Sequence, residues 1–150
     1  MLCEVIALGC LVAHGDIKAS HQPKLQREDF PGKILKQLEE LHNEFYPQPI
    51  TFKQTGPMSA TWTVVKDGFL AQAELPRLYG KCGDALHRGN LKKLLKPRMP
   101  VRQSYPEIWR WAERINELLK EHRISLIDGK AAVICQLGKP DAKVRVAWAA

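Results

Sequence analysis

The sequence predicts an α+β fold, with a mainly helical core of about four helices and a small C-terminal antiparallel β meander. Three observations carry this prediction: helical spacing of apolar residues through much of the chain, alternation of apolar and polar residues near its C-terminus, and turn residues between the alternating runs. Helices that come before strands, rather than alternating with them, are typical of α+β proteins. With 150 residues, of which 45% are hydrophobic, the chain is expected to form a single domain, residues 1–150.

The first helix is expected over residues 2–13, which are apolar almost all round and give way to polar residues near Gly15. The run contains Glu4 and is shorter than the ~20 residues that a membrane-spanning helix needs. It also lacks the basic start of a targeting segment. We therefore expect a buried helix, no membrane association and a cytoplasmic protein.

A second helix is expected after a polar connection, with Asp29 as its N-cap and Pro47 beyond its end. Its apolar residues recur at helical spacing: Ile34, Leu35, Leu38, Leu41 and Phe45. Residues 50–66 follow and are rich in threonine, valine and aromatic residues. They are compatible either with a β-hairpin or with an extended loop that crosses the core.

A central helix is expected next, with an apolar stripe of Leu75, Leu78, Tyr79, Cys82, Ala85, Leu86 and Gly89. Gly80, Gly83 and His87 form a separate face of this helix. A glycine inside a helix costs about 1 kcal/mol relative to alanine, so this face suggests the close approach of a partner helix or a ligand. One interpretation is a homodimer that packs through the face. The other is that the glycines mark a broken helix, or one packed against Trp62.

The last helix is indicated by a capping pattern, Ser104 followed by Glu107. Its apolar stripe runs towards His122 through Ile108, Trp111, Ala112, Ile115, Leu118 and Leu119. Arg114 is expected to pair with Glu117 on the polar face. Trp109 lies off the stripe, either as part of an interface or as a partly buried surface residue.

The end of the chain alternates between apolar and polar residues in the runs ISLI, KAAVICQL and KVRVAWA. Asp128 and Gly129, between the first two runs, are a strong hairpin-turn signal. These runs are the basis for the predicted C-terminal meander.

Residues 76–102, here called the basic segment, hold nearly all of the charge imbalance of the chain. Eight Lys or Arg residues stand against the single acid Asp84, a local charge of +7 that equals the net charge of the whole chain. Positive charge gathered in one segment is typical of proteins that bind a polyanion, most often RNA or DNA. The residues expected to bind nucleic acid are Arg77, Arg88, Asn90, Lys92, Lys93, Lys96, Arg98 and Arg102.

Within the basic segment, the chain reads KCGDALH from Lys81 to His87. This stretch resembles the motif of HEPN (higher eukaryotes and prokaryotes nucleotide-binding) domains, in which an Arg and a polar residue precede a His near one end of a helix. Lys81 stands where that family has Arg, and Cys82 stands where it has the polar residue. Many HEPN domains are metal-independent ribonucleases that work as dimers. The resemblance therefore implies an RNA-binding protein of a toxin or defence system, degenerate or active as an endoribonuclease.

The same resemblance implies roles for three candidate catalytic residues. His87 would act as general base or acid towards the ribose 2′-hydroxyl, and Lys81 or Arg88 would stabilise the phosphate in the transition state. Asp84, three residues before His87, either orients the imidazole or pairs with Arg88. Two further interpretations stay open: a non-catalytic protein-interaction or dimerisation module, and a purely structural role for these residues.

The four cysteines are far apart in sequence and have no Cys-x-x-Cys spacing, which argues against a zinc ribbon and against a disulfide scaffold. Cys3, Cys10 and His14 share one stripe of the first helix, but thiols on a core helix are ordinary packing. We expect reduced thiols, no metal and no cofactor. RNA or another polyanion and a second copy of the chain are the expected partners.

Overall fold

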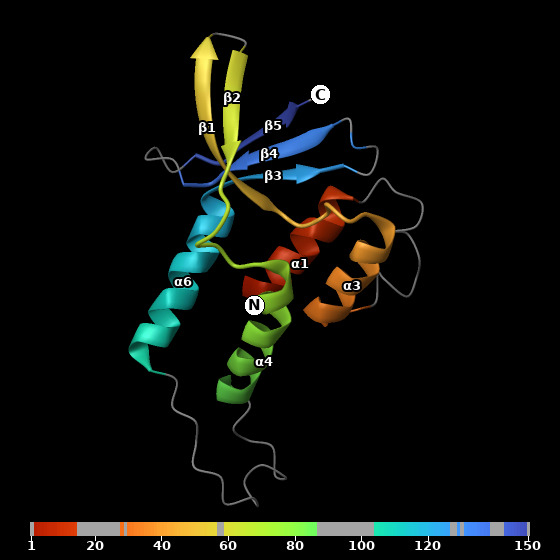
Figure 1. Ribbon diagram of the computed structural model, residues 1–150. Helices are drawn as coiled ribbons and strands as arrows, with labels where there is room; N and C mark the ends of the chain where they lie inside the picture. The colour runs from red at the N-terminus through yellow and green to blue at the C-terminus, as the bar shows by residue number, and fades with distance from the viewer. Residues whose placement is uncertain are drawn as a thin grey trace, which may run out of the picture.

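The computed structural model describes residues 2–14, 28, 30–56, 59–86, 104–126, 129, 131–138 and 143–149, except the side chains of 84–86 (Figure 1). The helices are α1 (Leu2–Ala13), α3 (Pro31–Leu41), α4 (Leu75–Leu86) and α6 (Tyr105–Lys120), with a short 3₁₀ turn, η2 (Gln72–Glu74), before α4. The strands are β1 (Gln48–Gly56), β2 (Ser59–Val64), β3 (Glu121–Ser125), β4 (Ala132–Gln136) and β5 (Arg145–Ala149).

The five strands form one antiparallel sheet in the order β2-β1-β3-β4-β5, curled into a half-barrel. Figure 1 shows the β1–β2 hairpin rising from the rest of the sheet. The prediction of a mainly helical core with a small C-terminal meander is wrong, because strands from the middle of the chain belong to the same sheet as the C-terminal strands.

Strand β1 joins the hairpin to the C-terminal strands, a connection that the sequence did not predict. Its first two residues, Gln48 and Pro49, pair with Arg123 and His122 of β3. From Ile50 onward it pairs with β2, so residues 50–56 and 59–64 form the two strands of a hairpin rather than a loop across the core. Proline, which has no N–H to donate to a neighbouring strand, is tolerated near the start of a strand, and Pro49 is the second residue of β1.

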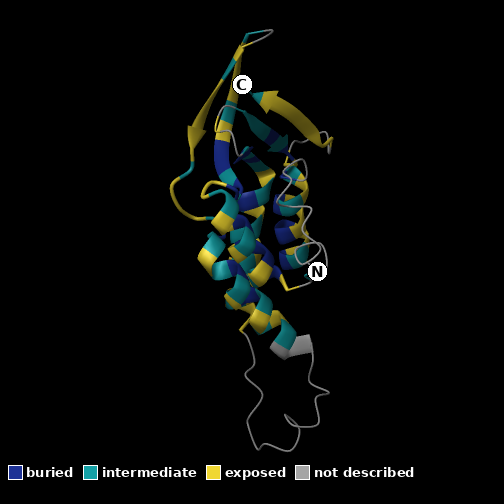
Figure 2. Ribbon diagram, turned by 90° about the vertical axis from the view of Figure 1, so that its right-hand side faces the viewer, coloured by how far each residue is buried: buried dark blue, intermediate teal, exposed yellow. Residues whose placement is uncertain are grey.

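The core lies among α1, α3 and α4, with one contribution from α6. Its buried residues are Cys3, Ile6, Ala7, Cys10, Ile34, Leu35, Leu38, Phe45, Leu70, Leu75, Leu78 and Leu118. Helix α6 stands at the side of this cluster, and Leu118 is its one buried residue. Figure 2 shows the contrast between the buried helical layer and the largely exposed hairpin.

The helix boundaries follow local signals in part. At the start of α6 the Ser104 hydroxyl accepts a hydrogen bond from the Glu107 amide at 3.4 Å, so the predicted cap is confirmed. Helix α3 instead begins at Pro31 after Phe30, which has no capping side chain; Asp29 lies outside the described residues. Proline is compatible with a first helical position because its missing N–H would have no partner there.

Two histidines fasten the helical layer to the sheet. His14 Nε2 lies 3.1 Å and His42 Nε2 lies 3.0 Å from the carbonyl oxygen of Ser125 at the end of β3. His14 Nδ1 lies 2.8 Å from the carbonyl oxygen of Cys10, within α1. Both ring nitrogens of His14 therefore face backbone carbonyl oxygens.

None of the helices in the described ranges combines the length and the apolar character needed to cross a membrane.

Candidate nucleic-acid interface at the ends of α4 and α6

The described structure contains only part of the predicted site. Arg77 is exposed on α4, Lys81 is half-buried one turn further on, and Asp84 is known only as a position in that helix. The other predicted residues lie outside the described ranges: His87, Arg88, Asn90, Lys92, Lys93, Lys96, Arg98 and Arg102. Whether Lys81 and His87 come together is therefore a prediction from the sequence alone.

Lys81 is engaged within the chain. Its ammonium forms an ion pair with the Glu107 carboxylate of α6 and lies 5.8 Å from the centre of the Trp111 ring. The hydrogen bond from Lys81 holds the pKa of Glu107 below its usual range. Lys81 thus bridges α4 and α6, and a role towards a phosphate would require it to exchange this carboxylate for another anion.

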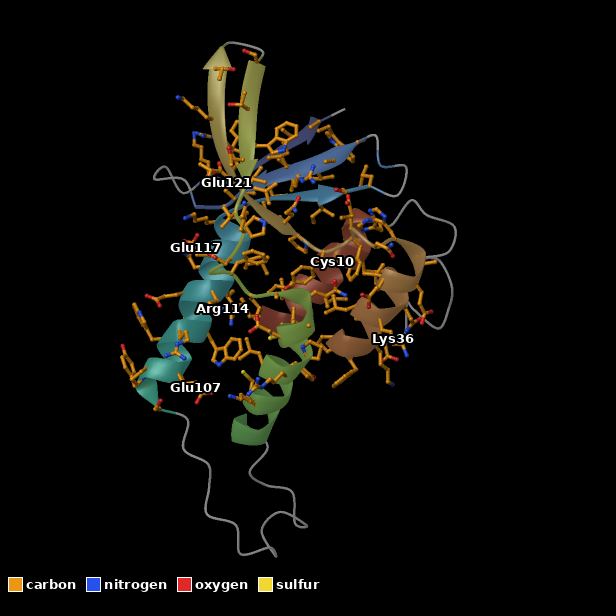
Figure 3. The ribbon with its side chains drawn as sticks, in the orientation of Figure 1. Cys10, Lys36, Glu107, Arg114, Glu117 and Glu121 are labelled. Carbon is orange, nitrogen blue, oxygen red and sulfur yellow. The ribbon has the colours of Figure 1, made fainter. Side chains whose placement is uncertain are left out.

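Trp111 is flanked by a second cation, which anchors the middle of α6. The Arg114 guanidinium carbon lies 5.4 Å from the Trp111 ring centre, within range of a cation–π interaction. Arg114 Nη1 donates to Glu74 at 2.7 Å, and Nη2 donates to the Phe69 carbonyl oxygen at 2.7 Å. The hydrogen bond from Arg114 is the main cause that holds the pKa of Glu74 below its usual range, and a hydrogen bond from the Ala71 amide acts in the same direction. Figure 3 places Arg114 about half-way along α6, with Glu107 at the end farther from the sheet.

Two aromatic side chains stand exposed at that end of α6. The rings of Tyr105 and Trp109 are stacked, with centres 6.3 Å apart and planes inclined by 23°. They are 74% and 56% exposed, so more than half of the surface of each side chain is accessible. Trp109 Nε1 donates to Glu113 at 2.8 Å, which holds the indole against its own helix.

This pair adjoins the basic segment directly, because residue 102 precedes the Ser104 cap by two positions. The sequence marked Trp109 as lying off the apolar stripe but gave no role to Tyr105. The signal that would have found the pair is its i, i+4 spacing, which places two side chains on the same side of a helix.

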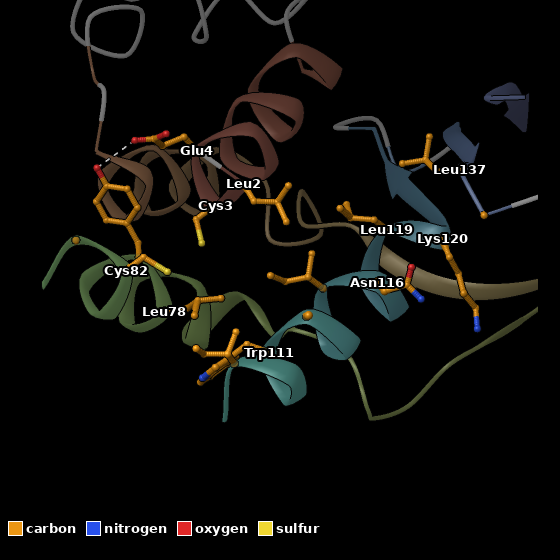
Figure 4. Close-up of a pocket in the computed structure, with 16 residues that line it drawn as sticks. Leu2, Cys3, Glu4, Leu78, Cys82, Trp111, Asn116, Leu119, Lys120 and Leu137 are labelled. Carbon is orange, nitrogen blue, oxygen red and sulfur yellow. Dashed lines mark hydrogen bonds between the residues drawn. The ribbon is translucent and has the colours of Figure 1, made fainter. Parts of the chain in front are cut away.

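An apolar groove of about 650 Å³ runs between α1, α4 and α6 (Figure 4). Its walls include Leu2 and Cys3 of α1, Leu78 of α4, and Trp111 and Ile115 of α6. The volume is in the range of small-molecule pockets, roughly 300–1,000 Å³. Its described lining is mainly apolar, and it also includes Glu4, Asn116 and Lys120.

The two glycines of α4 differ in their surroundings. Gly83 lines the groove, whereas a Cβ placed on exposed Gly80 would meet nothing within 4 Å. No close contact within the described chain therefore requires glycine at position 80. The predicted homodimer through this face stays a prediction.

All four cysteines are free, and they differ in access. Cys3 and Cys10 are buried, Cys135 is half-buried and Cys82 is exposed. Burial raises the pKa of the Cys10 thiol to about 12, and burial followed by the nearby Cys82 raises that of Cys3. Among the described residues, no three His, Cys, Asp or Glu side chains converge on a possible metal position.

Comparisons of the chain with known protein families, with curated proteins and with solved structures found no match.

Proposed function

We propose that the chain binds single-stranded nucleic acid, RNA first of all, through the basic segment and the adjoining Tyr105–Trp109 pair. The observation that carries the proposal is the pairing in sequence of a +7 segment with two stacked, exposed aromatic rings. Proteins that bind single strands combine these two features: cations along the backbone and aromatic faces on which bases stack.

Each feature has its own part in the proposed binding. Lysine and arginine side chains between residues 88 and 102 neutralise phosphates and release counterions, which supplies most of the affinity. Tyr105 and Trp109 offer faces to unpaired bases, which a double helix keeps stacked on one another. A preference for single strands over duplex follows.

Binding without cleavage is the form of the proposal that the described contacts support best. In the HEPN-like pattern, Lys81 takes the place of the family's arginine, and its ammonium is already paired with Glu107. Cleavage is tested separately, by incubating the protein with RNA in the presence of EDTA beside His87→Ala. RNA cut by the wild type and left intact by the variant would replace the binding proposal with a catalytic one.

The stacking part is tested with Trp109→Ala, with Trp62→Ala as the matched control. Trp62 is an exposed tryptophan on β2, 42% accessible, and the β1–β2 hairpin lies at the opposite end of the molecule from the first turn of α6 (Figure 1). Loss of a stacked base costs about 1–3 kcal/mol, so we expect the Kd of Trp109→Ala for a short RNA to rise roughly 5- to 150-fold. Equal affinities of the two variants would exclude Trp109 from the interface.

A further inference from the structure

Two cysteines that are far apart in sequence, Cys3 of α1 and Cys82 of α4, line the same apolar groove. Figure 4 shows the two thiols together between α1 and α4. The Cys82 thiol is near enough to act electrostatically on the thiol of Cys3. The other two cysteines are placed differently: Cys10 is fully buried about two turns further along α1, and Cys135 lies on β4.

The packing of α1 against α4 holds these two thiols near each other. The Tyr79 hydroxyl donates a hydrogen bond to the Glu4 carboxylate at 3.2 Å. Leu78 is buried in the same core cluster as Cys3. Leu78 and Tyr79 come four and three residues before Cys82, and residues at this spacing share one face of a helix. Cys82 therefore continues the face of α4 that contacts α1.

The two thiols differ in their access to solvent. Cys82 is exposed, whereas Cys3 is only 5% exposed. A reagent in solution reaches the first thiol but not the second. Redox-sensing cysteines are accessible to solvent and often lie next to a second thiol that resolves the first product. Cys82 and Cys3 match these two positions.

We propose that Cys82 and Cys3 are an oxidative modification site, which a low-molecular-weight disulfide such as oxidised glutathione converts into a disulfide between α4 and α1. The Cys82 thiolate attacks one sulfur of the glutathione disulfide, so that a mixed disulfide forms and one glutathione thiolate leaves. The Cys3 thiolate then attacks the Cys82 sulfur, and the second glutathione leaves as a thiolate. The two protein thiols lose two protons and two electrons, and the electrons reduce one glutathione disulfide to two thiols.

Burial sets the order and the relative rates of the two steps. The second step takes place inside the protein and needs no further reagent. Burial, followed by the nearby Cys82, raises the pKa of the Cys3 thiol, so its thiolate is scarce at neutral pH. The second step should therefore be slower than the first, and the mixed disulfide on Cys82 should accumulate before it decays.

The disulfide would fasten α4 to α1 and restrict movement between them. Cys82 lies within the basic segment, so oxidation would act on the part of the chain to which nucleic-acid binding is assigned. Formation of the disulfide does not depend on that binding.

The test follows the native full-length chain in oxidised glutathione by intact mass and by counting free thiols after an acid quench. The wild type should gain one glutathione, then lose it as two of its four thiols disappear. Cys3→Ala should keep the glutathione adduct, and Cys82→Ser should form neither product. Cys135→Ser is the matched control and should pass through both steps as the wild type does. Circular dichroism checks folding, and Cys3→Ser replaces Cys3→Ala if the latter does not fold.

Peptide mapping without reductant locates the bond. No Lys or Arg precedes Lys18, so Cys3 and Cys10 share one tryptic peptide, and mapping is repeated in Cys10→Ala to separate them. A link between this peptide and that of Cys82 should survive in Cys10→Ala and be lost in Cys3→Ala. A wild type whose Cys82 takes up no glutathione, or keeps it without closing the disulfide, overturns the proposal. So does a disulfide from Cys82 to Cys10, to Cys135 or to a second copy of the chain.

Discussion

The four cysteine thiols differ in burial, and their rates of reaction should differ accordingly. The thiolate is the reactive form, so a buried thiol with a raised pKa reacts slowly. We expect Cys82, exposed on α4, to react first with a disulfide reagent in the native protein, and Cys10, whose pKa is about 12, to react only on unfolding. Stopped-flow labelling measures this, and Cys82→Ser should abolish the fast phase. A fast phase that persists in this variant would contradict the described burial.

His122 should make stability depend on pH. Burial lowers its pKa from the usual 6.5, although its hydrogen bond to the Leu119 carbonyl oxygen opposes the shift. The unfolded chain therefore takes up a proton at a higher pH than the folded chain, and stability falls as the pH drops below about 6.5. Urea unfolding at about pH 7.5 and about pH 5.5 should show this loss.

The matched variant for this prediction is His122→Gln, which retains a hydrogen-bond donor but does not titrate. The carboxylates of Glu74 and Glu107, whose pKa values are lowered from 4.5, stay ionised over this range and do not contribute. The difference in unfolding free energy between the two pH values should be smaller in the variant. An identical difference would show that His122 is not the titrating group.

Arg114 shows that helical periodicity does not determine which partner a long side chain binds. Helical spacing predicted a pair with Glu117, whereas the guanidinium bonds Glu74 and the Phe69 carbonyl oxygen. Both partners come from the segment that leads into α4, about 40 residues earlier in the chain. Glu117 pairs instead with Lys120 at 2.8 Å. Short-range rules give candidate partners, but the fold decides which of them a long side chain reaches.

At the scale of elements, residues on α6 that share one apolar stripe should differ in how much they contribute to stability. Leu118 is fully buried, whereas Ile108, on the same predicted stripe, is 52% exposed. Leu118→Ala should cost about 2–5 kcal/mol of unfolding free energy, as expected for a buried leucine. Ile108→Ala should change it by less than about 1 kcal/mol. Chemical denaturation of both variants measures this, and similar losses would mean that α6 packs along its whole length.

The same helix shows which of its features the sequence predicts: the position of the helix, but not the burial of each residue on its apolar stripe. The apolar stripe and the Ser104 cap located α6 correctly, because both are encoded within a few residues. Periodicity tells which residues share a face, but not whether another element covers that face. Most of the α6 stripe lines an apolar groove, so Ile108 and Leu118 differ in burial despite equivalent positions in the pattern.

For the whole molecule, the sheet was the part that sequence did not predict. The alternating C-terminal runs favoured local hairpins, and residues 50–66 were ambiguous between a hairpin and a loop. The missing information is the pairing of Gln48 and Pro49 with β3, across more than 70 residues. No local pattern encodes such a contact, which joins the β1–β2 hairpin to the C-terminal strands in one sheet.

The sequence alone indicated some features of the candidate site, whereas other features depend on the fold. The basic segment follows from counting charges, and Trp109 follows from its place off the apolar stripe. The stacking of Trp109 with Tyr105 and the engagement of Lys81 by Glu107 both depend on the three-dimensional placement of α4 and α6. The catalytic roles of His87, Lys81 and Asp84 stay predictions.

Binding of a fluorescently labelled single-stranded RNA, followed by anisotropy over a series of salt concentrations, tests the central claim most directly. We expect measurable binding at about 50 mM salt and a steep linear fall of log K with log salt, because phosphate contacts release counterions. Lys92→Glu combined with Lys93→Glu should weaken binding and reduce that slope by roughly 1 or more. No binding at about 50 mM salt, or a slope that the double variant leaves unchanged, would contradict the proposal.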